Sequence, residues 1–241
     1  MYTTNNKLIL LIALISISNI SYAEKAPFKS SYEPLPYTNT IFRNANIYDG
    51  EGNEFSETDL LIKDGKIISI GSDLPSSPEF IEVDASGKWI TPGIIDIHSH
   101  MGVYSAPSVS TSSDGNESTS PVTADVWAEH SIWTQDPQFA LALKGGVTTF
   151  HVLPGSANLI GGRGVTAKNV QRNTINSMKF PNAPHTLKMA CGENPKRVYG
   201  NRKQAPSTRM GNIAGYRKAW IEAESYLSRL DEYDSKSDEA K

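Results

Sequence analysis

The spacing of hydrophobic residues divides the chain into two regions with different patterns. From residue 41 to residue 92, short apolar runs are separated by turn dipeptides such as Asp64-Gly65, which predicts short β-strands joined by hairpins. After Pro92-Gly93 the run GIIDIH is continuously apolar, which is typical of a strand buried on both faces of a parallel sheet. Strand-like and helix-like segments then alternate up to about residue 230. The chain is therefore predicted to be α/β, with a small all-β module before an α/β barrel or layered sheet.

The second region contains several elements that the sequence locates. Its segments VTTFHVLPG, GVTAKNV and TLKMACG predict three further strands, the second of them short. The segment DPQFALALKGG predicts a helix that ends at Gly145-Gly146, and NIAGYRKAWIEAESYLSRL carries an apolar helical stripe. The Ser/Thr-rich residues 103–123 are expected to form a loop over the end of the first strand. The charged residues 231–241 are expected to form a disordered tail.

The first 23 residues have the pattern of a secretory signal peptide. Lys7 precedes the apolar run LILLIALISIS, and the small residues Ser21 and Ala23 favour cleavage after Ala23. The run is too short to cross a bilayer comfortably, and an uncleaved N-terminal anchor is the alternative. We therefore expect an exported protein, periplasmic or secreted, with no membrane association after cleavage. Residues 24–40, rich in Pro, Ser and Tyr, are expected to form an extended leader.

Composition and charge narrow the class of protein. The chain has 241 residues, of which 38% are hydrophobic and 20% charged, as in an ordinary globular protein. Its formal net charge of -3 gives no electrostatic reason to expect nucleic acid as a partner. Cys191 is the only cysteine, so no internal disulfide can form and stability must come from a packed core.

Two histidines end the first strand of the second region. Side chains two residues apart on a strand share a face, so His98 and His100 are expected to point the same way. In parallel α/β folds the C-terminal end of a strand is where active sites lie, and two adjacent imidazoles can bind one divalent ion. Asp96 lies on the same face and could accept a hydrogen bond from a ring nitrogen. The alternatives are surface histidines at a loop entrance and a structural aspartate.

Longer motifs resemble a known family. The segment TPGIIDIHSHMG, with the β-module before it and GGVTTFHVLPGS after it, resembles the amidohydrolase superfamily. The segments PGSANLIGGRG, LKMACGENPKRVYG and PSTRMGN are similar to its imidazolonepropionase-like, secreted or periplasmic branch. The resemblance covers nearly all of residues 41–230. It implies a β-sandwich-type module over residues 41–92 and, over residues 93–230, the first part of a (β/α)8 TIM-like barrel, apparently truncated.

The resemblance also implies a chemistry. His98 and His100 would bind a divalent metal, expected to be zinc, with one or two ions in a complete enzyme. The metal would activate a water molecule that hydrolyses the C–N bond of a small-molecule amide or cyclic amide. Members of the superfamily also use a carboxylated lysine or a glutamate, two further histidines and a late aspartate as base. No residue of this chain is assigned as the catalytic base.

Glu193 is our candidate for the carboxylate ligand, because it follows the predicted strand TLKMACG at its C-terminal end. The alternative is a loop carboxylate that pairs with Lys196 or Arg197. Lys188 lies inside the strand and is interpreted as structural. His151 is either a ligand or a hydrogen-bonded core residue, whereas His130 and His185 are expected on a helix and in a loop.

Two further segments have simpler interpretations. The glycine-rich IGGRG fits neither phosphate-loop spacing, so it indicates a close approach of backbone near the mouth of the site. A basic cluster could bind a substrate carboxylate, although such runs more often form a solvated loop. Its members are Lys196, Arg197, Arg202, Lys203 and Arg209.

The chain is short for the barrel that the resemblance implies, and this affects the function expected of it. A complete barrel usually takes about 250 residues, more than the 241 of the whole chain. We therefore expect the N-terminal portion of an amidohydrolase with little activity alone. Two alternatives are a non-catalytic exported binding module and one half of a split enzyme, in which a second chain supplies the missing barrel strands.

Overall fold

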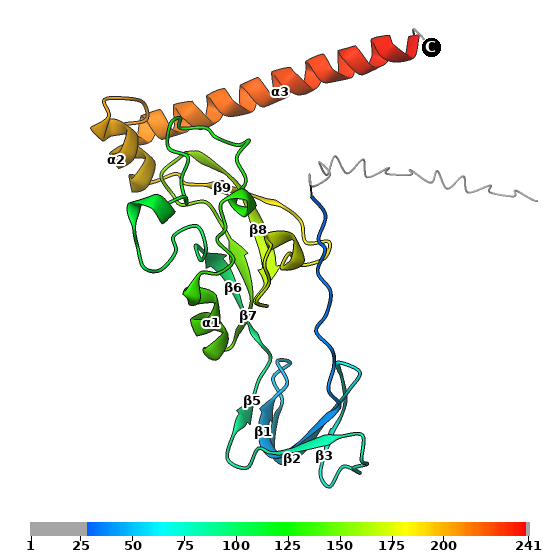
Figure 1. Ribbon diagram of the computed structural model, residues 1–241. Helices are drawn as coiled ribbons and strands as arrows, with labels where there is room; N and C mark the ends of the chain where they lie inside the picture. The colour runs from blue at the N-terminus through cyan, green and yellow to red at the C-terminus, as the bar shows by residue number, and fades with distance from the viewer. Residues whose placement is uncertain (1–27, 240–241) are drawn as a thin grey trace, which may run out of the picture.

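The computed structural model describes residues 28–239 and shows a mixed α/β molecule with two sheets (Figure 1). The predicted signal peptide, residues 1–23, and the leader residues up to 27 lie outside the described part of the chain. Within residues 28–239, no helix has both the length and the apolar content needed to cross a bilayer.

The first sheet is formed by the short-strand region. Its order is β3-β2-β1-β4, with β5 also paired to β1; β2 runs antiparallel to β1 and β3, whereas β4 and β5 run parallel to β1. Asp64 and Gly65, which join β2 to β3, have φ values of 51° and 73°, as a two-residue type I′ hairpin requires. This hairpin confirms the one predicted from the sequence. The strands are β1 (Thr40–Tyr48), β2 (Glu54–Lys63), β3 (Lys66–Gly71), β4 (Ile81–Asp84) and β5 (Trp89–Ile90).

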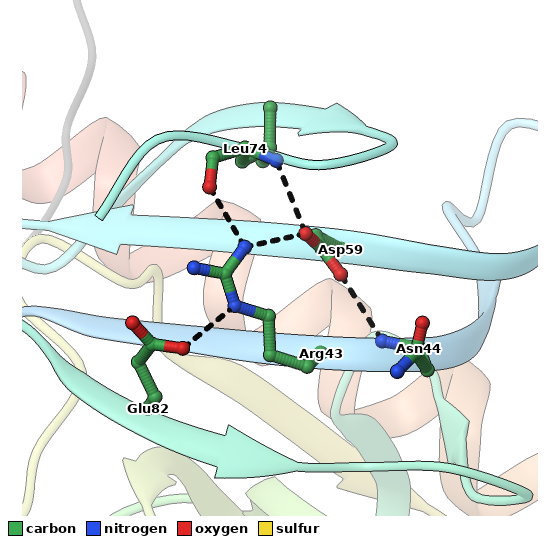
Figure 2. A network of polar contacts seen from close by, with 5 residues as sticks. All are labelled: Arg43, Asn44, Asp59, Leu74 and Glu82. Atoms are coloured by element: carbon green, nitrogen blue, oxygen red, sulfur yellow. Dashed lines mark hydrogen bonds and ion pairs between the residues drawn. The ribbon is translucent and has the colours of Figure 1, made fainter.

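A polar network ties the strands of this sheet to the segment after β3 (Figure 2). The Arg43 guanidinium donates to Asp59 Oδ2 at 2.6 Å, to Glu82 Oε2 at 2.9 Å and to the Leu74 carbonyl at 2.7 Å. The Asp59 carboxylate also accepts the backbone N–H groups of Asn44 and Leu74, both at 3.1 Å. Asp59 is nearly fully buried, so these donors satisfy a charge that would otherwise be costly to bury.

The second sheet contains the strands β6 (Ile94–Ser99), β7 (Val147–Val152), β8 (Ile160–Lys168) and β9 (Thr186–Met189), in that order. β6 and β7 are parallel, but β8 runs antiparallel to both β7 and β9. A parallel crossover needs about a dozen residues or more, whereas residues 153–159 alone join β7 to β8. The short connection therefore makes the sheet mixed, and the predicted short strand GVTAKNV is part of a longer antiparallel β8.

β6 departs from the sequence prediction in its burial. The run GIIDIH was expected to be buried on both faces, but Ile95 and Ile97 are 63% and 77% exposed. β6 lies at the edge of the sheet and pairs only with β7 among the described strands. Its apolar side chains therefore lack a covering layer within the described residues.

The core of the second sheet lies between β7, β8 and α1 (Pro137–Lys144). Phe139 of α1 stacks on Phe150 of β7 with ring centroids 5.0 Å apart. Asp136 caps α1 by accepting the N–H of Gln138, and Gly145 follows its last residue, as predicted. The buried cluster consists of Val103, Ala128, Phe139, Phe150, Val152, Val165, Ala167 and Met178.

Two helices follow β9, namely α2 (Glu193–Asn201) and α3 (Arg209–Glu239). Figure 1 shows α3 extending past the rest of the molecule. The expectation of a disordered tail from residue 231 is wrong up to Glu239, since the helix continues through it. Lys236 pairs with Glu232 one turn earlier at 2.6 Å, and such pairs support an exposed helix.

Candidate metal centre

The two histidines predicted to bind metal lie side by side at the end of β6. Their ring centroids are 5.2 Å apart and the ring planes meet at 85°. His100 Nδ1 lies 2.8 Å from the Leu153 carbonyl oxygen, which can only accept, so Nδ1 carries a proton and Nε2 is the nitrogen that holds the lone pair when the ring is neutral. Burial, followed by the charges of Lys188 and His100, lowers the pKa of His98 and favours its neutral form. Both rings can therefore present a nitrogen lone pair.

Asp96 does not have the contact expected of it. Its Oδ1 accepts the backbone N–H of His98 at 3.0 Å, not a ring nitrogen. The alternation of the strand places the carboxylate one step below His98, and its contact there is with the main chain. Asp96 therefore shapes the strand end and does not fix a histidine tautomer.

Lys188, which was expected to be structural from its place inside a strand, is the third residue at this place. Its side chain is buried on β9, with Nζ 3.4 Å from His98 Nε2 and 3.1 Å from the Pro154 carbonyl oxygen. Burial lowers the pKa of this amine. The signal in the sequence was a lysine within an apolar strand, but only the pairing of β8 with β9 brings it to the histidines.

Glu193 is not brought to the histidine pair. It is the first residue of α2, its side chain is 72% exposed, and its carboxylate lies 3.3 Å from Lys196 Nζ. This is the pairing that the sequence analysis gave as the alternative. Within residues 28–239 no three His, Cys, Asp or Glu side chains are grouped so that they could hold a metal. The predicted set of His98, His100 and Glu193 is therefore not assembled, because the chain turns outward into α2.

His151 has both ring nitrogens occupied. Nδ1 lies 2.9 Å from Thr166 Oγ1 and Nε2 lies 2.7 Å from Thr186 Oγ1. Burial, and to a lesser extent the charge of His98, lowers its pKa. Of the two roles predicted for His151, these contacts favour the hydrogen-bonded core residue over the metal ligand.

The other two histidines lie elsewhere. His130, in the 3-10 helix Ala128–His130, has Nε2 3.8 Å from Glu129 Oε1. His185 meets the Trp127 ring edge-on, with ring centroids 4.6 Å apart.

The glycines of IGGRG allow a close approach of backbone, as predicted. A Cβ on Gly164 would lie 2.9 Å from His151 Nε2 and 2.7 Å from Thr186 Oγ1. Gly162 has a φ of 110°, and a Cβ there would lie 2.6 Å from the Val126 carbonyl oxygen. In the basic cluster, Arg202 donates to Ser118 Oγ at 3.0 Å and also contacts its carbonyl oxygen.

Pro154, whose carbonyl oxygen accepts from Lys188, also lines a cavity of about 610 Å³ together with Gly115, Asn116 and Trp127. The volume of this cavity is within the range of small-molecule sites. Pro154 therefore connects the lysine of the centre to the cavity, although His98, His100 and Lys188 do not line it.

Comparison with known proteins gives relatives that agree with the resemblance seen in the sequence. No protein-family model matches the chain. The chain is 34% identical over 220 residues to Amidohydrolase tasK of Hapsidospora irregularis, covering 80% of this chain and 22% of that protein. It is 34% identical over 115 residues to an allantoinase of Bacillus licheniformis, covering 48% of this chain and 20% of that protein.

A solved structure extends the likeness to the fold. The crystal structure of an amidohydrolase from Thermotoga maritima MSB8 superposes with a TM-score of 0.72 at 39% identity, covering 80% of this chain and 49% of that one. The chain thus spans about half of the solved relative and about a fifth of the two sequence relatives. With the histidine pair at the end of β6, these likenesses show that the chain belongs to the amidohydrolase superfamily.

Proposed function

We propose that this chain contributes the first metal ligands of a metal-dependent amidohydrolase, which hydrolyses a C–N bond in a small amide or cyclic amide. The observation that carries the proposal is the placement of His98 beside both His100 and Lys188, with Pro154 connecting the lysine to a cavity. We also propose that the β1–β5 sheet is the β-sandwich-type module of the superfamily. The strands β6–β9 would then belong to its (β/α)8 barrel.

The charges of the donor set decide whether it fits a divalent ion. Two neutral imidazoles suit zinc, but an ammonium 3.4 Å from His98 Nε2 would repel a cation. A neutral Lys188 amine can add to CO₂, which forms an N–C bond and releases one proton. The resulting carbamate brings anionic oxygens to the same place, so the residues fit a divalent ion once Lys188 is carboxylated. Lys188 thus replaces Glu193 as our candidate for the carboxylate donor.

Each residue of the set has a separate task. The Leu153 carbonyl oxygen fixes the His100 tautomer, and the Pro154 carbonyl oxygen holds the Lys188 side chain beside His98. A divalent ion bound here would lower the pKa of a water molecule and polarise the amide carbonyl. The walls formed by Trp127 and Pro154 would limit the access of bulk water to the substrate.

The names of several relatives support a cyclic amide as the substrate. Besides the allantoinase, they include a dihydroorotase of Ligilactobacillus salivarius and an L-hydantoinase of Paenarthrobacter aurescens. Dihydroorotate, allantoin and hydantoins are small cyclic amides. A cavity of about 610 Å³ would accommodate a molecule of that size.

Metal titration tests the proposal directly. We expect the chain to bind Zn²⁺ in isothermal titration calorimetry, with higher affinity when bicarbonate is present to carboxylate Lys188. His98→Ala and Lys188→Ala should each lower the affinity at least about 10-fold, since each removes a donor. Glu193→Gln is the matched control and should bind as the wild type does. Wild-type affinity in Lys188→Ala, with a loss in Glu193→Gln, would contradict the assignment of the carboxylate.

We also propose that the chain is exported and cleaved after Ala23, on the basis of the apolar run and the small residues before the cut. The described leader contacts begin at Phe28, so this cleavage would leave them intact. N-terminal sequencing of protein from the exported fraction should begin at Glu24.

A further inference from the structure

Tyr104 lies in the loop after β6 and contacts the second histidine of the pair. Its ring meets the His100 ring edge-on, with centroids 5.7 Å apart and planes at 82°. The Tyr104 backbone N–H donates to the His100 carbonyl oxygen at 3.1 Å. The same turn that carries His100 therefore brings Tyr104 against it, although the proposed function gives this ring no role.

The hydroxyl of Tyr104 is anchored through two asparagines. It donates to Asn116 Oδ1 at 2.8 Å, and Asn116 Nδ2 donates to Asn158 Oδ1 at 3.3 Å. Asn158 is almost completely buried, and its Nδ2 contacts the Glu117 carbonyl oxygen at 2.6 Å and the Ser120 carbonyl oxygen at 2.8 Å. The chain of contacts thus runs from the His100 ring into a buried part of the loop 113–123.

Two glycines allow this arrangement. A Cβ on Gly115 would lie 2.3 Å from carbon atoms of the Tyr104 ring. A Cβ on Gly155 would lie 2.2 Å from Asn116 Oδ1 and 2.8 Å from the Tyr104 hydroxyl oxygen. The Gly155 N–H also donates to the Gly115 carbonyl oxygen at 2.7 Å. Both glycines are needed for the contact of Tyr104 with Asn116, because any larger side chain would displace one of the two.

One hydrogen bond does not hold a histidine ring in a single orientation, because hydrogen bonds tolerate a range of angles. The bond from His100 Nδ1 to the Leu153 carbonyl oxygen therefore limits the rotation of the ring about its Cβ–Cγ bond but leaves part of it free. The Tyr104 ring lies against His100 at a separate point and restricts this remaining rotation. Aromatic pairs also favour the observed edge-to-face geometry over other orientations.

We propose that Tyr104, held by Asn116, is a positioning residue that fixes the plane of the His100 ring and so the direction of its Nε2 lone pair. The consequence for metal binding rests on the proposed function, since it requires His100 to be a ligand. The orientation of the ring does not depend on that function and can be measured without metal.

The test compares variants that break the anchor in two ways. Tyr104→Phe keeps the ring and removes its hydrogen bond to Asn116, whereas Gly155→Ala places a methyl group where Asn116 Oδ1 now lies. We expect both to shift or broaden the His100 ring signals in metal-free NMR spectra. We also expect both to lower Zn²⁺ affinity by about 3- to 10-fold, below the roughly 10- to 100-fold typical when a direct hydrogen-bond partner of a ligand is lost.

Tyr216→Phe is the matched control. The Tyr216 hydroxyl donates to the Leu159 carbonyl oxygen at 3.1 Å, so the variant also removes a phenol hydrogen bond to a backbone carbonyl, but one outside the contacts of Tyr104, Asn116 and Asn158. It should leave the His100 signals and the Zn²⁺ affinity unchanged. Thermal unfolding of each variant shows whether the fold is retained.

The outcomes separate the two proposals. Unchanged His100 signals in both Tyr104→Phe and Gly155→Ala would overturn the positioning role of Tyr104, as would an equal change in Tyr216→Phe. If the His100 signals shift as expected but the wild type binds no Zn²⁺, the positioning role is upheld and the proposed metal site fails.

Discussion

Gly164 shows, at the scale of one residue, how closely backbone approaches side chains near the candidate centre. A Cβ at this position would lie 2.7 Å from both Leu153 Cδ2 and Thr186 Oγ1, and 2.9 Å from His151 Nε2. Real Cβ atoms do not tolerate such distances, so a substitution must displace these three side chains or shift β8 itself. The glycine-rich segment thus keeps these strands at the spacing that places Lys188 beside His98.

We predict that Gly164→Ala lowers the free energy of unfolding by about 1–3 kcal/mol, the usual cost of overpacking. Urea unfolding followed by circular dichroism measures this change. Gly71→Ala is the matched control, because Gly71 lies in β3 without a positive φ and a Cβ there would be in ordinary contact with Leu74 Cδ2 at 3.5 Å. An equal loss of stability in both variants would contradict the close-approach argument.

The sequence predicted some site residues and missed one for a physical reason. His98 and His100 could be found because residues two apart on a strand share a face, which is a local property. Lys188 could not be assigned, because its position depends on the register between β8 and β9 and on the short link after β7. Glu193 looked suitable from its place after a strand, but the local start of α2 turns it toward Lys196.

At the scale of elements, the Arg43–Asp59 network holds β1, β2 and the segment after β3 together (Figure 2). Burial acts to raise the Asp59 pKa, but the hydrogen bond from Arg43 and those from the Asn44 and Leu74 backbones outweigh it. The pKa is therefore held below its ordinary value of 3.8. The carboxylate thus needs its donors, and removing its charge leaves Arg43 without its most buried partner.

We predict that Asp59→Asn lowers the free energy of unfolding by about 2 kcal/mol at neutral pH, since buried donors lose their acceptor. Because the folded pKa is lowered, the stabilisation by Asp59 is present above pH 3.8 and is lost as pH falls through the folded pKa. The difference between wild type and variant should therefore shrink in acid. Urea titrations between neutral pH and pH 3 measure it.

Glu79→Gln is the control for this prediction. The Lys63–Glu79 pair is exposed and joins the two groups at 3.1 Å, so its loss should change stability by less than about 0.5 kcal/mol. If the difference between wild type and Asp59→Asn grew toward low pH, the assigned direction of the Asp59 pKa would be wrong.

Element type was more predictable than element direction. The hairpin at Asp64-Gly65 and the helix α1 follow from turn and cap residues that act within a few positions. The antiparallel run of β8 and the exposed β6 do not, because they depend on which strands become neighbours. The continuation of α3 to residue 239 was not predicted, because a run of charged residues is typical of a disordered tail. In the structure Glu232 and Lys236 pair along the helix and support it.

At the scale of the whole molecule, the leader spans both sheets (Figure 1). Near the second sheet, the Phe28 carbonyl oxygen accepts from Lys179 Nζ at 2.9 Å, and Ser30 Oγ donates to the Lys179 carbonyl oxygen at 2.7 Å. The Ser31 N–H donates to the Asn176 carbonyl oxygen at 2.9 Å. Near the first sheet, the Tyr37 ring lies where a Cβ on Gly65 would be. The leader therefore links two sheets that are otherwise joined through residues 91–93.

We predict that deleting residues 28–36 lowers the free energy of unfolding by about 2–4 kcal/mol, from several lost hydrogen bonds at about 0.5–1.5 kcal/mol each. The buried Lys179 would keep its 2.7 Å contact with Glu129 but lose the Phe28 carbonyl, so part of the loss falls on the second sheet. Urea unfolding measures the change. Limited proteolysis should also cut faster at residues 91–93, because the two sheets would then be joined only there.

Two substitutions distinguish the effect of specific leader contacts on stability from a general effect of shortening the chain. Ser30→Ala removes the hydrogen bond to the Lys179 carbonyl oxygen and the one from the Tyr32 N–H, and should lower stability by about 1–2 kcal/mol. Glu33→Ala should be close to wild type, because Arg172 reaches the Glu33 carbonyl oxygen and not its side chain. If deletion left both stability and the rate of cutting unchanged, the leader contacts would add nothing to folding. The two sheets would then be held in place by residues 91–93 alone.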